Sequence, residues 1–109
     1  SSHHVKGIEV YRQRPIFYGC GDFFDDYEGI AGYERYRDDL VLMYFVALAP
    51  DSGMLRCCTM TPLQIRRFRL NRASEQDGLW LRNLLRREGA PLGTGVELGV
   101  NGRLVLTWD

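Results

Sequence analysis

The stretch Leu40–Met60, LVLMYFVALAPDSGMLRCCTM, decides the fold that the sequence predicts. Its first nine residues are apolar, a run that is long for a strand and too short to cross a bilayer. We therefore predict a central strand over residues 40–48 that is covered on both faces. Pro50–Gly53 is a turn signature, because proline presets one φ angle and glycine permits the positive φ that closes the turn. Residues 54–60 should then pair back antiparallel.

Two more β-hairpins are indicated on either side of this stretch. Gly7–Tyr11 (GIEVY) and Pro15–Tyr18 (PIFY) are short β-rich runs, and the residues between them are expected to form the turn. Residues 96–100 and 103–108 flank Asn101–Gly102, the preferred pair for a two-residue type I′ turn.

The segment Pro62–Arg72 (PLQIRRFRLNR) changes the parity of its apolar residues near Arg66 and Arg67. Leu63 and Ile65 stand on one parity, and Phe68 and Leu70 stand on the other. A change of parity inside a strand predicts a β-bulge at that point.

A single helix is predicted over residues 74–88. Ser74–Asp77 (SEQD) has the pattern of a capping box, with a hydroxyl that accepts from the third helical N–H and an acid that reaches back. An apolar stripe follows, and its members are Trp80, Leu81, Leu84 and Leu85. Gly89 and Pro91 are expected to end the helix.

Composition limits the class of protein. With 109 residues, the chain is long enough for one core, so we predict one domain over 1–109 and an α+β or αβ-sandwich fold of mostly antiparallel strands with one main helix. The formal net charge of +0 gives no reason to expect a nucleic acid or an anionic membrane as partner, and no apolar run has the length of a membrane span. The three cysteines should be free thiols, with one of the adjacent pair Cys57–Cys58 in the core.

Residues 1–26 carry a more specific signal. They read SSHHVKGIEVYRQRPIFYGCGDFFDD, and they resemble the C-terminal part of the CapA family, the poly-γ-glutamate capsule-synthesis proteins related to metallophosphoesterases. His3 falls on the second histidine of a Gly-His-x-x-His stretch, and Gly7–Glu9 match a Gly-Ile-Glu. Tyr11–Tyr18 keep the spacing of the family's hairpin, and Gly21–Phe23 replaces Gly-Asn-Phe. The motif region spans 1–28, and the strands, helix and terminal hairpin of 40–109 resemble the more variable tail.

The resemblance implies a metallophosphoesterase-type parent that is involved in synthesis or processing of a capsule polymer, and in which two divalent metals (Mn, Fe, Zn or Mg) activate a water molecule for hydrolysis. The family's other ligand stretches have no counterpart in this sequence, so the chain alone is expected to be inactive and to bind metal weakly. Its main partner would be the missing N-terminal half of the same protein, and exposed sheet edges predict self-association of the isolated chain.

Candidate site residues follow from the same alignment. His3, with His4 as its neighbour, is the predicted metal ligand, although composition alone also allows a tag remnant or a frayed end. Asp22 is the candidate catalytic residue, because it stands where the family keeps an asparagine beside the metal cleft. It belongs to an acidic cluster that also fits a solvated loop; the other members are Asp25, Asp26 and Glu28.

A stripe of arginines is the candidate surface for a polyanionic polymer. Its members are Arg66, Arg67 and Arg69, with Arg72 next to them, and a guanidinium suits carboxylate or phosphate. The alternative hypothesis is a non-enzymatic interaction module, which would use this stripe together with the aromatic-acidic loop of residues 22–36. The compartment stays open, because free cysteines favour the cytoplasm and the resemblance favours the cell envelope.

Overall fold

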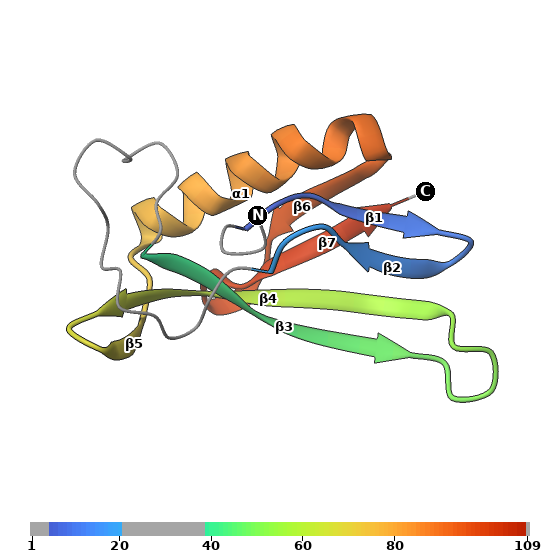
Figure 1. Cartoon of the computed structure of the whole chain (residues 1–109), viewed down its shortest axis with the longest axis horizontal. Helices are drawn as coiled ribbons and strands as arrows, with labels where there is room; N and C mark the ends of the chain where they lie inside the picture. The colour runs from blue at the N-terminus through green and yellow to red at the C-terminus, as the bar shows by residue number, and fades with distance from the viewer. Residues whose placement is uncertain (1–4, 21–38, 109) are drawn as a thin grey trace.

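The computed structural model describes residues 5–20 and 39–108. Seven strands and one α-helix occur in these ranges, in the order β1, β2, β3, β4, β5, α1, β6 and β7 (Figure 1). Short 3₁₀ turns follow α1 at Ala90–Leu92 and precede β7 at Val100–Gly102. The predicted α+β class, mostly antiparallel with one main helix, is confirmed.

The main sheet has five strands. Its order is β3 (Leu40–Leu48), β4 (Leu55–Arg66), β7 (Leu104–Trp108) and β6 (Thr94–Leu98), and β5 (Arg69–Arg72) pairs with one end of β4. A separate hairpin consists of β1 (Ile8–Tyr11) and β2 (Arg14–Phe17), and all of these pairs are antiparallel. The twelve-residue strand β4 is therefore the central strand, because it pairs with β3, β5 and β7.

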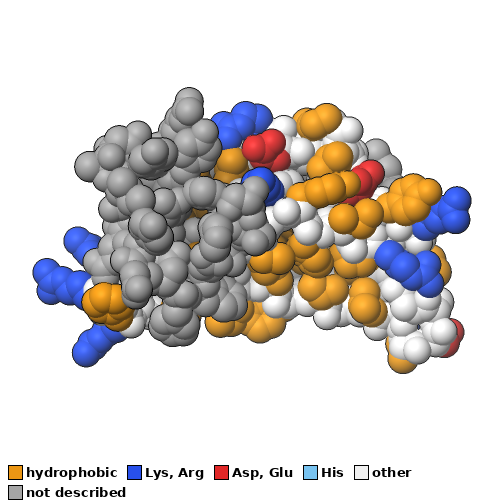
Figure 2. All heavy atoms as spheres, viewed as in Figure 1, with side chains coloured by type: hydrophobic (Ala, Val, Ile, Leu, Met, Phe, Trp, Pro, Cys, Tyr) orange, Lys and Arg blue, Asp and Glu red, His pale blue; other side chains and the backbone are white. Residues whose placement is uncertain are grey.

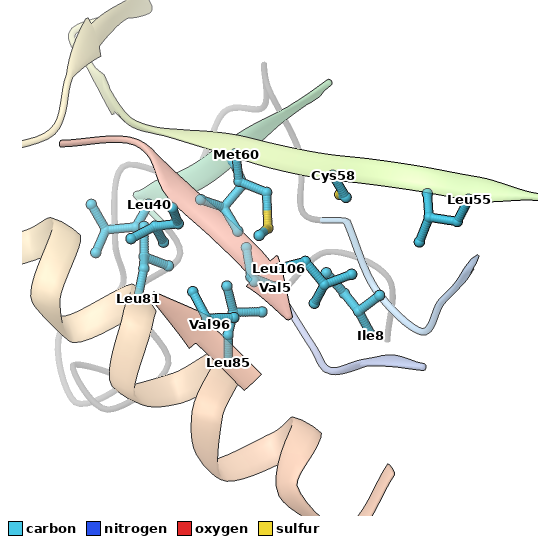
Figure 3. Packing of buried hydrophobic residues seen from close by; sticks show 12 residues of the cluster. Val5, Ile8, Leu40, Leu55, Cys58, Met60, Leu81, Leu85, Val96 and Leu106 are labelled. Carbon is cyan, nitrogen blue, oxygen red and sulfur yellow. The ribbon is translucent and has the colours of Figure 1, made fainter. Parts of the chain in front are cut away.

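One face of this sheet carries the core, which is covered by α1 (Glu75–Gly89) and by the β1–β2 hairpin (Figure 3). Sheet side chains such as Met60 and Leu106 point toward Leu81 and Leu85 of the helix, and Val5 and Ile8 complete the cluster. A smaller buried group of Val41, Leu63 and Ile65 forms a second cluster. This cluster lies on the face of the sheet opposite the main core. Val41 and Leu63 are Cα partners, and they alternate along β3 and β4 with residues whose side chains point into the main core.

The three predicted turns and the predicted helix are confirmed, with small differences in their details. Arg12 and Gln13 both have positive φ, as do Asn101 and Gly102, so both hairpins turn through two left-handed residues. The hydroxyl oxygen of Ser74 accepts a hydrogen bond from the amide of Asp77 at 3.1 Å and caps α1. Gly89 stays in the right-handed region, and the left-handed residue that ends this stretch is Gly93, at φ 81°.

Two predictions were wrong. The segment 62–72 has no bulge at Arg66–Arg67; a two-residue turn at Arg67 and Phe68, with φ of 51° and 60°, divides it into β4 and β5. The turn explains the change of parity, because each strand of a hairpin keeps its own alternation. The apolar strand β3 is not central either. Within residues 5–20 and 39–108 it is an edge strand, and from Met43 onward its side chains are half-buried or exposed.

Candidate functional site

The segment that follows the candidate metal ligand His3 forms a hairpin whose two ends are hydrogen-bonded to each other. Val5 and Cys20 form an antiparallel bridge, and the amide of Lys6 donates to the carbonyl oxygen of Gly19 at 2.9 Å. The amide of Tyr18 donates to Gly7 at 3.2 Å. The two ends of the described range 5–20 are therefore neighbours. His3, His4 and Asp22, together with the rest of the acidic cluster, lie outside the described residues.

Gly7 explains how this segment is attached to the rest of the fold. A Cβ atom at this position would lie 3.0 Å from the carbonyl oxygen of Glu88 and 3.1 Å from its Cβ, so glycine allows a close approach to the end of α1 that a larger residue would crowd. On the next element, the hydroxyl of Thr94 donates a buried hydrogen bond of 2.7 Å to the carbonyl oxygen of Ile8. The Gly7–Ile8 pair of the family motif is thus fixed to both α1 and β6.

The outer side of the hairpin is polar and aromatic. The hydroxyl of Tyr18 donates to a carboxylate oxygen of Glu9 at 2.6 Å, and this hydrogen bond raises the pKa of Tyr18 above its usual value. The guanidinium of Arg12 stacks 5.3 Å from the ring centre of Tyr11. At the hairpin tip, Arg14 donates to the carbonyl oxygen of Ser52 at 2.6 Å and ties the hairpin to the β3–β4 turn.

The candidate polymer-binding arginines lie together at the opposite end of the sheet. Arg66, Arg67 and Arg69 are exposed around the β4–β5 turn and line a shallow, open hollow with Asn71. Figure 2 shows basic side chains gathered around an apolar group at this end of the molecule. The sequence indicated the cluster; it did not indicate that a turn would gather it. Arg72 is separate, since its guanidinium donates to the carbonyl oxygen of Asn101 at 2.6 Å.

A groove that the sequence did not predict lies beside the start of α1. It encloses about 390 Å³, and among its lining residues are Pro62, Ser74, Gly78 and Asn101. The groove lies where the β6–β7 turn approaches the β5–α1 connection, on the side of β4 that is away from β3. No local pattern could have revealed it, because its walls are distant in the sequence.

The cysteines have structural positions, as predicted for Cys57 and Cys58. Cys58 is fully buried in the core, and Cys57 is exposed on the other face of β4. Burial, with smaller contributions from Cys57 and Cys20, raises the pKa of the Cys58 thiol from 9.0 to about 11. A thiol that stays protonated at neutral pH is a poor nucleophile and a poor metal ligand.

This pKa gives a prediction for alkaline stability. Because the fold holds the neutral thiol, its contribution is complete below pH 9, the unfolded pKa, and is lost as the pH rises through about 11. The free energy of unfolding should fall by about 1.4 kcal/mol per pH unit over this window for one such group. Chemical denaturation at several pH values measures the slope. Burial also raises the pKa of Tyr44 above its usual 10.0, so the comparison applies between pH 9 and 10. In this range Cys58→Ala should flatten the slope, and Cys57→Ala should keep most of it; equal slopes in all three proteins would contradict the assignment.

Comparison with known proteins defines the class. The model of the family "Bacterial capsule synthesis protein PGA_cap" matches residues 1–27. Probable polyglutamine synthesis accessory proteins from two strains of Mycobacterium tuberculosis are each 50% identical to the chain over 96 residues. An uncharacterized protein of Sinorhizobium fredii, y4sH, is 49% identical over 35 residues, which is 31% of this chain and 8% of that protein.

These matches confirm the resemblance drawn from the sequence: residues 1–27 match the model of the capsule-synthesis family, and most of the chain is similar to part of the mycobacterial proteins. The mycobacterial alignments cover 88% of this chain and 25% of each relative, so the chain spans about a quarter of the length of these relatives. No helix within residues 5–20 and 39–108 has the length and apolar character needed to cross a membrane.

Proposed function

We propose that the chain is the C-terminal part of a longer protein that acts in the synthesis or processing of a capsule-type polymer of glutamate units. The observation that carries this proposal is the 50% identity to probable polyglutamine synthesis accessory proteins over 88% of the chain. A match of this breadth must include most of the β-sheet and helix, in addition to the hairpin segment. The function of those relatives is therefore the best available guide to the function of this chain.

The finer proposal is that the whole protein is a metal-dependent hydrolase of phosphoester or amide bonds. Imidazole from His3, with His4 beside it, and carboxylate from Asp22 are donors that suit divalent metals such as Mn, Fe or Zn. When bound, a metal pair would supply an activated water molecule and neutralise charge on the substrate. Support comes from the closed base of the segment: Val5, two residues after His3, is bridged to Cys20, two residues before Asp22. Both candidate residues are thus two positions from neighbouring points of one hairpin segment.

The arginine cluster offers a second element of the same function. Arg66, Arg67 and Arg69 present guanidinium groups on a tight turn, where they can bind several carboxylates of a polyanionic chain. Phe68, which is 69% exposed between them, would contact the methylene groups of such a polymer. The same surface is what a non-enzymatic interaction module would use, so this observation supports polymer binding with or without hydrolysis.

Replacing His3 tests the metal-dependent part. In the longer protein, assayed with manganese and a phosphodiester substrate, His3→Ala should lower activity by about 100-fold or more and weaken manganese binding in calorimetry, because a ligand contributes at least as much as the groups that orient it. Glu97→Gln, an exposed change on β6, serves as the control and should leave both unchanged. Full activity and unchanged manganese affinity in His3→Ala would remove His3 from the site.

A further inference from the structure

The edge strand β3 is unusual in its composition and its exposure. None of its nine residues is charged, and none is proline or glycine, although its outer edge has no strand partner among the described residues. Stable proteins usually protect a free edge with a charge, a proline, a bulge or a short strand. Here the pairing with β4 is regular from Leu40 to Ala47, and the register shifts only at Leu48. Strand β3 thus keeps a long edge with regular pairing on one side and no strand partner on the other among the described residues.

The other edge of the sheet follows the usual rule. Strand β6 has five residues, and it contains Gly95 and the exposed acid Glu97. The hydroxyl of its first residue, Thr94, donates a hydrogen bond to the carbonyl oxygen of Ile8 in β1, so β1 partly covers this edge. The contrast between the two edges indicates that the exposure of β3 is specific to that side of the molecule.

Part of the sheet face beside this edge is also exposed, beyond the buried cluster of Val41, Leu63 and Ile65. Cα partners share a face, so Met43, Phe45 and Ala47 lie beside Thr61, Thr59 and Cys57 on the side opposite the main core. Phe45 is 49% exposed and Met43 is 36% exposed. None of these six side chains is charged.

We infer that the outer edge of β3 and this adjoining face are the docking surface for the rest of the same polypeptide, which adds a strand to β3 and covers Phe45. This inference rests on the proposal that the chain is part of a longer protein. About three quarters of each mycobacterial relative lies outside the matched region, so a large partner in the same molecule is at hand. A tethered partner also binds at high effective concentration, which favours it over free proteins.

A second copy of the chain fits the surface less well. Two β3 strands could pair edge to edge, but such a pair extends both sheets in the same plane and leaves both Phe45 faces in water. The remainder of the longer protein can pair with the edge and cover the face at once. The dimer and the intramolecular arrangement therefore differ in what happens to Phe45.

Hydrogen exchange on the longer protein tests the inference. Half of the backbone amides of β3 point away from β4, and in the longer protein these amides should exchange about tenfold or more slowly than in the 109-residue chain. Phe45→Lys in the longer protein should restore at least tenfold faster exchange across Met43–Leu48. Val100→Lys is the matched control, because Val100 is an exposed apolar residue (79%) in the β6–β7 turn, and it should change nothing in β3.

Several outcomes would overturn the inference. Fast exchange of these amides in the longer wild-type protein would show that the edge stays free. Equal protection in the monomeric 109-residue chain would mean that the chain covers its own edge. Protection that rises with protein concentration, together with a dimer in sedimentation, would assign the surface to a second copy. None of these measurements depends on catalytic activity, so failure here is distinguishable from failure of the proposed hydrolase.

Discussion

Replacing Leu81 with alanine should lower the free energy of unfolding by about 3 kcal/mol, within the 2–5 kcal/mol range that is typical of fully buried leucines. Leu81 has 0% exposure and lies in the main core between α1 and the sheet (Figure 3). The loss combines the transfer free energy of the missing methyl groups with the cost of a cavity that close-packed neighbours fill only partly. Urea denaturation followed by far-ultraviolet circular dichroism measures it.

The matched control for this change is Leu98→Ala. Leu98 is also a leucine in regular structure, but it is 47% exposed at the end of β6. Its replacement should cost less than about 1 kcal/mol, since surface substitutions away from special features have small effects. If both variants lost the same free energy, α1 would not pack against the sheet in the way described.

Local chemistry explains which parts of the fold were predictable. Ser74 caps α1, Asn101–Gly102 turns β6 into β7, and Gly53 closes the β3–β4 turn with φ of 73°. Each of these features depends on a residue whose preference acts over a few positions. The sequence contains that information without reference to the rest of the chain, so these elements were predicted close to their observed bounds.

The two errors have different physical origins. The turn at Arg67 and Phe68 has positive φ at both positions without glycine, asparagine or aspartate, so it carries none of the residues by which such turns are recognised. The edge position of β3 was missed because an apolar strand that is buried in a sheet and one that forms an interface have the same composition. The apolar composition of β3 is therefore consistent with a strand that is buried in a larger molecule.

The candidate site also has features that the sequence predicted and features that it did not. The arginine cluster was predicted as a group, because Arg66, Arg67 and Arg69 are close in sequence, but its location on a turn depends on β4–β5 pairing. His3, His4 and Asp22 were found by the resemblance, and the described structure adds the bridge between Val5 and Cys20. Long-range features, such as the groove beside α1, have no local sequence pattern, because residues on separate elements form them.

The last prediction compares two glycines of the same helix. Gly89→Ala should lower the free energy of unfolding by about 2–4 kcal/mol, because overpacking and the loss of a buried hydrogen bond act together. A Cβ atom at this position would overlap Oγ1 of Thr94 and lie 3.1 Å from the carbonyl oxygen of Thr94. Thr94 would have to turn away, and the 2.7 Å hydrogen bond that its hydroxyl donates to Ile8 would break.

Gly78→Ala should have the opposite sign. Gly78 is buried in the first part of α1, and its Cβ would meet only Cγ of Pro62, at an ordinary distance of 3.8 Å. Alanine in a helix interior is more favourable than glycine by about 0.5–1 kcal/mol, so this variant should be slightly stabilised. Urea denaturation of both proteins gives the two values. Helix propensity favours alanine over glycine at both sites. A difference in the sign of the two stability changes would therefore come from the contact between Gly89 and Thr94, whose hydroxyl holds Ile8 of β1. Equal effects at the two positions would mean that this contact does not hold the motif in place.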